Sequence, residues 1–223
     1  GVMKLINFAH GDFFTFGSYM GYTLLVTGIT FVTSTLGVWG GMIAAMLVAA
    51  ICSGILGLSV EHIAYRPIYP AGRLPAVVSA LGASIFIQNA IMIIWGPRPH
   101  AYTSEVIPGF ILNIAGFRIN ILQIIILLLS FLLMGILYYI VQKTTFGAAI
   151  RASALDRETA ALMGININLI IFFIFALGPA LGGIAGVMVG MYYRKISFIM
   201  GWNFGLKAFT ATILGGIGNI PGA

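Results

Sequence analysis

The sequence contains unusually few charged residues. Only 7% of its 223 residues are Asp, Glu, Lys or Arg, whereas 60% are hydrophobic. A soluble domain carries roughly 25% charged residues. So few charges cannot cover a surface that faces water, so the composition excludes a soluble globular domain. It predicts instead a protein whose solvent is the lipid bilayer.

Cysteine and the common catalytic motifs are also scarce. Cys52 is the only cysteine, so no disulfide can form within the chain. The sequence has no G-x-x-x-x-G-K-[ST] loop, no H-E-x-x-H, no G-x-S-x-G and no cluster of His or Cys with ligand spacing. We therefore expect no enzyme, no metal, no cofactor and no P-loop binding of ATP by this chain itself. A membrane-embedded enzyme is the less favoured alternative, with His10, Asp12, Glu61 and His62 as its possible groups.

The net charge of +6 does not indicate a nucleic-acid partner. The basic residues are scattered at the ends of apolar runs, where membrane proteins carry anchoring charges. No basic run or RNA-binding signature accompanies them. We predict contact with lipid and none with nucleic acid.

Long apolar runs predict the fold class. A spanning helix needs about 20 apolar residues, and five runs meet that length: residues 12–31, 38–60, 76–95, 119–141 and 169–193. A sixth segment, 198–220, is interrupted by glycines near its end. The expected fold is all-α, a polytopic transmembrane bundle with broken helices. Because the chain starts and stops beside apolar patterns, we expect a single domain over 1–223 that is a fragment truncated at both ends.

Proline-containing connections separate these runs. Pro67, Pro70 and Pro75 predict an exposed turn over 61–75 in place of a continuous helix. Prolines and glycines over 97–118 predict a loop with a short hairpin. The distribution of basic residues among the short loops favours residues 61–75 and 143–168 on the cytosolic side and 97–118 outside.

Polar groups stand at the edge of the first apolar run. These are Asn7, His10 and Asp12, followed by the small-residue pair Gly17 and Gly21. We favour the interpretation that His10 and Asp12 cap a helix at the membrane interface, because Asp stabilises helix N-termini. A direct contact with a substrate is the alternative, since ionisable groups within a membrane are costly and often functional. Two possible ligands do not make a metal site.

The interval 143–168 is the only long polar stretch, and long apolar runs lie on both sides of it. Its alanines favour helix. Asp156 is positioned to cap a short helix over 157–163, which Gly164 can end. We predict an ordered cytosolic loop that binds another protein. Exposed apolar side chains on one side of the helix (the apolar tooth) would make the contact, and charged residues (the charged rim) would surround them. Its residues are Arg151, Leu155, Asp156, Arg157, Glu158, Leu162 and Gly164.

Glycines also recur in the later apolar segments. Gly178, Gly182, Gly186 and Gly190 stand at every fourth position, a pattern that predicts a close seam between helices. The closing sequence LGGIGNIPGA, which contains Asn219, cannot hold a regular helix. Such breaks are tolerated in a membrane where protein or a water-filled path surrounds them, and they often lie beside a transport path.

Three motifs resemble one family, the branched-chain amino acid ABC importer permeases. They are INFAHGD at 6–12 followed by Gly17-Ser18-Tyr19, then Gly147-x-x-Ile150-Arg151-Ala152-x-x-x-Asp156 with Ala160-x-x-x-Gly164-Ile165-Asn166, and finally Leu214-Gly215-Gly216-Ile217-Gly218 with Gly222. The second run resembles the coupling loop of that family, although Glu158-Thr159-Ala160 follows the general E-A-A-x-x-x-G pattern only loosely.

The resemblance implies a transmembrane permease subunit that imports branched-chain amino acids across a bacterial or archaeal cytoplasmic membrane. It implies four kinds of partner: a second homologous permease, two cytosolic ABC ATPases, an external substrate-binding protein and the bilayer. The translocation path would then include Asn7, His10, Asp12 and Asn219. Related permeases for urea and short amides have methionine where Phe8 stands, and they remain an alternative, as does a channel or facilitator that works without ATP.

Overall fold

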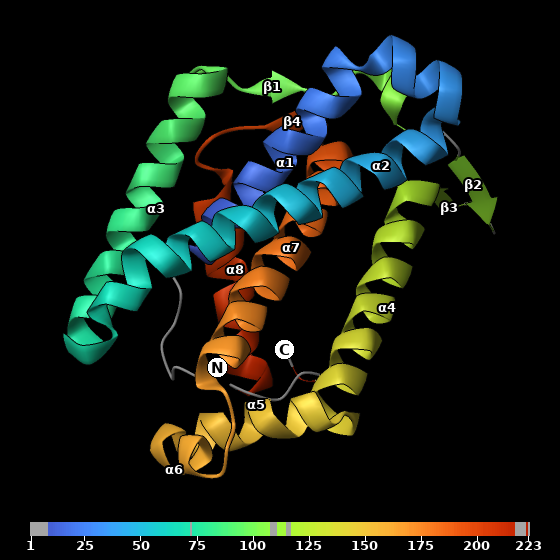
Figure 1. Cartoon of the computed structure of the whole chain (residues 1–223). Coiled ribbons are helices and arrows are strands. Elements are labelled where there is room, and N and C mark those ends of the chain that lie inside the picture. Colours follow the sequence, from blue (N-terminus) through green and yellow to red (C-terminus); the bar gives the residue numbers. More distant parts are fainter. Residues whose placement is uncertain (1–8, 72, 108–110, 115–116, 217–221, 223) are drawn as a thin grey trace.

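The structure is a computed structural model that describes residues 9–71, 73–107, 111–114, 117–216 and 222. Helices dominate it (Figure 1). The α-helices are α1 (His10–Thr27), α2 (Ile29–Val60), α3 (Arg73–Trp95), α4 (Ile121–Lys143), α5 (Thr145–Leu155), α6 (Arg157–Leu162), α7 (Ile167–Tyr193) and α8 (Met200–Gly215). The short strands are β1 (His100–Ala101), β2 (Ile111–Ile114), β3 (Phe117–Asn120) and β4 (Lys195–Ile196).

Within the described residues, four helices are long and apolar enough to cross a membrane: Gly37–Ile68, Leu74–Trp95, Ile121–Lys143 and Ile167–Tyr193. These correspond to four of the five predicted spans, and they confirm the prediction of an all-α polytopic bundle. The last predicted segment forms α8, which ends where Gly216 adopts a positive φ of 92°. A glycine tolerates that conformation without steric cost.

The predicted first span, residues 12–31, is wrong. Helix α1 ends at Thr27, Gly28 leaves helical geometry, and α2 begins at Ile29. A second break follows inside α2 at Gly37, which has a φ of 67°. The two glycines divide one apolar run between two helices, so α1 is a shorter helix enclosed by its neighbours and the next span starts at Gly37.

The predicted exposed turn over 61–75 is also wrong in its secondary structure. The chain continues from α2 through a π-helical turn, Glu61–Tyr65, and a 3-10 helix, Arg66–Ala71. Pro75 lies in the first turn of α3, where a missing N–H costs no helical hydrogen bond. Tyr65 is buried against Phe175, with ring centroids 5.1 Å apart. The prolines therefore end one helix and begin the next with almost no intervening loop.

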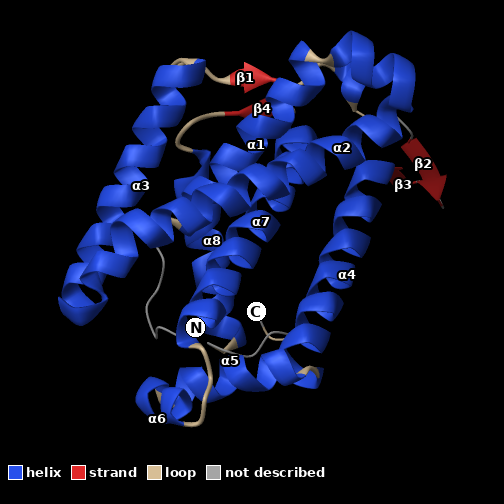
Figure 2. Ribbon diagram, viewed as in Figure 1, coloured by secondary structure: helices blue, strands red, loops and turns tan. Residues whose placement is uncertain are grey.

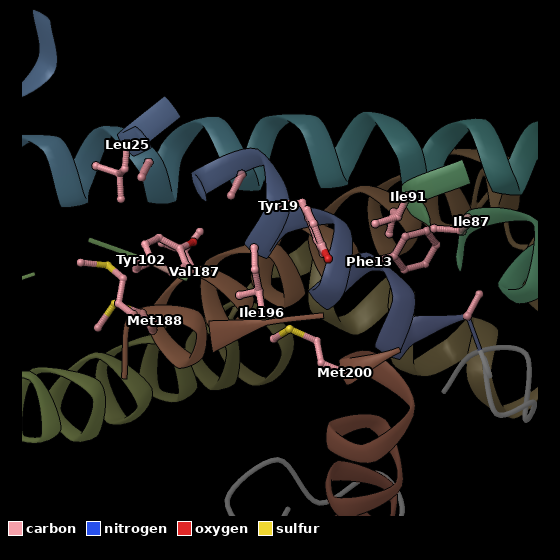
Figure 3. Packing of buried hydrophobic residues seen from close by; sticks show 14 of the residues in the cluster. Phe13, Tyr19, Leu25, Ile87, Ile91, Tyr102, Val187, Met188, Ile196 and Met200 are labelled. Atoms are coloured by element: carbon pink, nitrogen blue, oxygen red, sulfur yellow. The ribbon is translucent and has the colours of Figure 1, made fainter. Parts of the chain in front are cut away.

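The core forms where α1, α2 and α7 pack together. Phe13 and Tyr19 of α1 and Val187 of α7 have no exposed surface in this core, and Figure 3 shows them among the other buried side chains. Small residues allow the close approach. A Cβ atom added at Gly17 would overlap the Cα atom of Gly183, so only hydrogen fits between the two backbones.

The strands lie at one end of the bundle, and α5 and α6 lie at the other (Figure 2). Strands β2 and β3 form the antiparallel hairpin predicted within 97–118. Strand β1 pairs antiparallel with β4, which joins the α3–α4 connection to the end of α7. Tyr102 strengthens this junction because its hydroxyl donates a hydrogen bond of 2.9 Å to the Ser18 carbonyl of α1.

Helix α4 stands apart from this core (Figure 1). None of its most apolar window is buried inside the chain. It is held at its first turn, where Leu122 is buried and Gln123 Nε2 donates to the Tyr192 hydroxyl of α7 at 3.1 Å. The middle of α4 therefore presents its apolar side chains to lipid or to another subunit.

Candidate functional site

The polar interval 143–168 folds into two helices joined at a sharp corner. Helix α5 follows α4 after Thr144, and α6 begins after Asp156, which has an extended backbone (φ −149°, ψ 117°). Figure 1 shows both helices lying across the ends of α4 and α7. Phe146 of α5 packs on Phe173 of α7 with ring centroids 4.9 Å apart, so the unit is attached to the bundle by more than its covalent ends.

Asp156 caps α6, as its position in the sequence predicted. Its Oδ1 accepts hydrogen bonds from the backbone N–H groups of Glu158 at 3.0 Å and Thr159 at 3.3 Å. Its Oδ2 accepts a third, from the Thr159 hydroxyl at 2.6 Å. Glu158 in the first turn adds a negative charge next to the positive end of the helix dipole.

Gly164 ends α6, also as predicted. It has a φ of 83°, and its N–H donates to the Ala161 carbonyl at 3.0 Å. The N–H of Ile165 reaches back to the Ala160 carbonyl at 3.1 Å. These two bonds form a Schellman motif, which satisfies carbonyls that a helix end otherwise leaves without partners. A six-residue helix is therefore fixed at both ends.

Two aliphatic side chains at this end are almost fully exposed. Leu155 is 83% exposed and Leu162 is 87% exposed, and the side chain of Glu158 lies between them in sequence and is also exposed. The predicted grouping of all three on one helix is wrong, because Leu155 is the last residue of α5 and the extended Asp156 separates it from α6. The apolar tooth is shared between two helices.

Arg151, predicted on the charged rim, is exposed and also contacts α4. Its guanidinium donates a hydrogen bond to the Val141 carbonyl and so ties α5 to the last turn of α4. Gly147 serves the same corner, since an added Cβ atom there would overlap the Ile140 and Val141 carbonyl oxygens. Sequence reasoning missed Gly147 as a site residue. Arg157, at the start of α6, is partly buried.

The polar residues of the first segment divide into two groups. Asn7 and Asn219 lie outside the described residues. His10 begins α1 with an exposed side chain, and its ring lies 3.7 Å from the Cβ position of Gly178 on α7. The interpretation of His10 and Asp12 as caps is wrong, because Ala9 is the N-cap and no side chain caps α1.

Asp12 instead contacts α3. It is only 2% exposed, and its Oδ1 accepts a hydrogen bond of 2.9 Å from Gln88 Nε2. The same Gln88 nitrogen lies 3.3 Å from the hydroxyl oxygen of Ser84, one turn earlier on α3. Sequence reasoning missed Gln88 and Ser84, although two polar residues four positions apart in an apolar helix mark one polar face. Among the described residues, no group of three His, Cys, Asp or Glu side chains could hold a metal ion.

The glycines selected from the sequence lie in different environments. Gly17 and Gly21 of α1 face Gly183 and Val187 of α7 at distances that exclude a methyl group. Gly186 meets the Phe14 carbonyl, and Gly190 meets Ser18, Tyr102 and Ile196, at similarly short range. Gly178 and Gly182 have no atom closer than 3.7 Å to an added Cβ atom, so they do not belong to the tight part of the seam.

One close approach escaped sequence analysis. Gly11 in the first turn of α1 meets Gly201 in the first turn of α8, and a Cβ atom on either residue would overlap the backbone of the other. Phe14 and Phe204 pack beside this crossing, with ring centroids 5.2 Å apart. The two helix beginnings therefore meet in the interior of the molecule. No regular spacing signals it, since the glycines are far apart in sequence.

Comparison with known proteins covers the whole chain. The family model described as branched-chain amino acid transport system / permease component matches residues 1–223. The chain is 38% identical, over 100% of its length and 73% of theirs, to the high-affinity branched-chain amino acid transport system permease proteins LivH of Salmonella typhimurium and BraD of Pseudomonas aeruginosa. A ribose import permease protein of Haemophilus influenzae is 23% identical over 88% of the chain.

No solved structure matches the chain. The match to the family model and the two relatives nevertheless agree with the resemblance that the motifs carry, and the four apolar helices agree with a multi-pass protein of the cytoplasmic membrane. The chain belongs to the family of branched-chain amino acid transport system permease components.

Proposed function

We propose that this chain is the membrane-spanning subunit of an ATP-driven importer that carries branched-chain amino acids into a bacterial or archaeal cell. Its partners would be a second homologous permease, two cytosolic ABC ATPases and an external substrate-binding protein. The relatives' names support the substrate class. The absence of a P-loop motif from the sequence supports a separate ATPase, because this chain has no such loop for nucleotide phosphates.

The observation that carries the proposal is the α5–α6 unit. It presents Leu155 and Leu162 to solvent from two short helices that are capped and anchored to the bundle. Large exposed apolar side chains on a rigid element are typical of a protein-binding site. We assign this surface to the ATPase, with Leu155 and Leu162 entering an apolar pocket and Glu158 at its edge.

Rigid attachment gives the contact its effect. The Arg151 hydrogen bond joins α5 to α4, and the Phe146–Phe173 contact joins it to α7. A displacement of α6 by closing ATPases therefore reaches two spanning helices. We propose that this displacement switches the path between outward-open and inward-open states. Residues 143–168 are then the cytosolic coupling loop, and the strands lie on the external side.

We also assign Asn7, His10, Asp12 and Asn219 to the translocation path, of which His10 and Asp12 lie in the first turn of α1. The substrate would be a zwitterion with an apolar side chain. The beginnings of α1 and α8 meet at Gly11 and Gly201. The positive ends of two helix dipoles at one point favour a negatively charged group nearby.

A pair of charge reversals tests the coupling assignment. Glu158→Lys places a positive charge beside the proposed pocket, and Glu105→Lys makes the same change on an exposed residue at the opposite end. Both variants should insert in the membrane normally. We expect Glu158→Lys to lose the ATPase on co-purification, together with uptake and transport-stimulated ATP hydrolysis, whereas Glu105→Lys keeps the ATPase.

Arg151→Glu should show the same losses as Glu158→Lys, because it detaches α5 from the Val141 carbonyl. Normal co-purification and uptake in both Glu158→Lys and Arg151→Glu would refute the assignment of this unit to the ATPase. Uptake that survives depletion of ATP would refute the proposal of an ATP-driven importer and leave a facilitator.

A further inference from the structure

The Asp12 carboxylate is incompletely paired inside the molecule. One of its oxygens accepts a hydrogen bond from Gln88, but the other, Oδ2, is inaccessible to solvent and has no hydrogen-bond partner. The described structure pairs no Lys, Arg or His side chain with it. A buried carboxylate without a cation or a full set of hydrogen bonds is strongly unfavourable. Apart from the positive helix ends at Gly11 and Gly201, the described structure supplies no positive group to this carboxylate.

The neighbours of Asp12 define the kind of group that would complete it. Ser84, itself 3% exposed, contributes a hydroxyl, and Gln88 contributes an amide. At present the Gln88 Nε2 atom bridges Asp12 Oδ1 and Ser84 Oγ at 2.9 and 3.3 Å. A nitrogen with several hydrogens thus already sits between a carboxylate and a hydroxyl. A primary ammonium group can donate to the same two oxygens; its nitrogen is tetrahedral, has one more hydrogen and brings the positive charge that the carboxylate lacks.

We propose that Asp12, Ser84 and Gln88 form a binding site for the primary ammonium group of the transported amino acid, and that the Gln88 amide fills this site when no substrate is present. The inference rests on the proposed import of a zwitterion. In the loaded state the ammonium group takes the place of Gln88 Nε2 and donates to Asp12 Oδ1 and Ser84 Oγ, its third hydrogen is available to Oδ2, and the displaced Gln88 can turn its carbonyl oxygen toward it. A single carboxylate with two neutral oxygens favours a monovalent cation.

Gln88 is the most exposed of the three site residues. Gln88 is only partly buried, so its side chain covers Asp12 from the α3 side as a movable group. Side-chain hydrogen bonds connect α1 to α3, among them Gln88 to Asp12 at 2.9 Å and Trp95 to Thr23 at 2.8 Å. Phe13, Ile87 and Ile91 form the apolar part of the same interface, and Figure 3 shows them near one another. An aliphatic substrate side chain would find apolar surroundings beside the polar group.

Binding can be measured on the purified permease–ATPase complex in lipid nanodiscs, without the external protein and without nucleotide. Three probes separate the two ends of the substrate: leucine, 3-methylbutylamine, which lacks the carboxylate, and 4-methylpentanoate, which lacks the amine. We expect the first two to raise the midpoint of thermal unfolding and the third to leave it unchanged. Asp12→Asn should weaken the binding of leucine and of the amine about tenfold or more, since it removes a charge-assisted hydrogen bond.

A second variant keeps the proposal testable if Asp12→Asn does not fold. Gln88→Lys places an ammonium group beside Asp12 within the chain. It should leave the thermal midpoint equal to or above that of the wild type, because the carboxylate gains a charged partner, while leucine binding is lost. Gln142→Lys makes the same substitution at an exposed position near the end of α4 and should keep both stability and binding. Normal leucine binding by Gln88→Lys would overturn the proposal.

Two further results would overturn it. Protection by 4-methylpentanoate equal to that by 3-methylbutylamine would show that the ammonium group is not what the site recognises. Protection by sodium chloride, and not by potassium chloride or the amine, would identify a metal cation at Asp12. None of these binding measurements depends on coupling to the ATPase. Asp12→Asn should still co-purify with the ATPase, whereas the coupling proposal fails only through the variants of α5 and α6.

Discussion

Removal of the Asp156 cap should unfold α6 without unfolding the protein. The Asp156 carboxylate accepts three hydrogen bonds from the first turn of a helix that is only six residues long. Isolated helices shorter than about 12 residues are marginal in water. Because Leu162 and Glu158 are exposed, α6 gains little from packing apart from the buried Ala160. Its order therefore depends on its two ends.

The expected magnitude follows from the cap. Replacing an N-cap Asp by Ala costs roughly 0.5–2 kcal/mol, and a central value of about 1 kcal/mol raises the population of the open helix about fivefold. Asp156→Asn retains an oxygen that can accept from the Glu158 and Thr159 amides, so it should cost only a fraction of this. Global stability should change little in either variant, since α6 lies outside the α1–α2–α7 core.

Hydrogen exchange measured by mass spectrometry on peptides that cover 157–163 checks this expectation. Exchange there should accelerate about fivefold in Asp156→Ala and much less in Asp156→Asn, while peptides from α7 remain unchanged. Uptake should fall in the same order, because a disordered α6 transmits no displacement. Identical exchange in the two variants would show that the cap does not hold α6, and the account of the unit as two end-fixed helices would fail.

Two other predictions concern the rest of the fold. Gly186→Ala should destabilise the protein in detergent by about 1–3 kcal/mol, because the new methyl group meets the Phe14 carbonyl, whereas Gly178→Ala has room and should be neutral; equal unfolding midpoints would contradict this. Burial raises the pKa of Tyr102 above its usual 10.0, so its contribution to stability is complete below pH 10 and declines as the pH rises beyond it. Tyr102→Phe should lower the free energy of unfolding by about 1 kcal/mol at neutral pH, because it removes the hydrogen bond to the Ser18 carbonyl. Above pH 10 its unfolding midpoint should decline less than that of the wild type, and an identical pH profile in the two proteins would contradict this linkage.

The features that the sequence predicted correctly are those governed by near neighbours. Asp156 and Gly164 stand at the two ends of an alanine-rich segment, and cap chemistry depends on residues within three or four positions. The apolar runs at 76–95 and 169–193 became α3 and α7 because their length and composition suit a bilayer. Prolines and glycines also located the β2–β3 hairpin.

The errors have one physical source, which is that a tertiary contact or a backbone break is invisible to local pattern. The run 12–31 has the composition of a span, but Gly28 and Gly37 change the chain direction. Asp12 looked like a cap because it stands beside a helix start, yet its partner Gln88 is 76 residues away. Arg151 was predicted on a charged rim, and its hydrogen bond to the Val141 carbonyl of α4 could not be predicted from local pattern.

The isolation of α4 has a mechanical consequence. Its 23 residues span about 34 Å at 1.5 Å per residue, which is close to the thickness of the hydrocarbon layer. One end is joined to α5 and the other carries the β2–β3 hairpin, while no residue of its most apolar window is fully buried within the chain. Such a rod pivots more easily than it bends, and because Leu122 and the Gln123–Tyr192 hydrogen bond hold the hairpin end, a displacement begun beside α5 would swing the opposite end about that fulcrum.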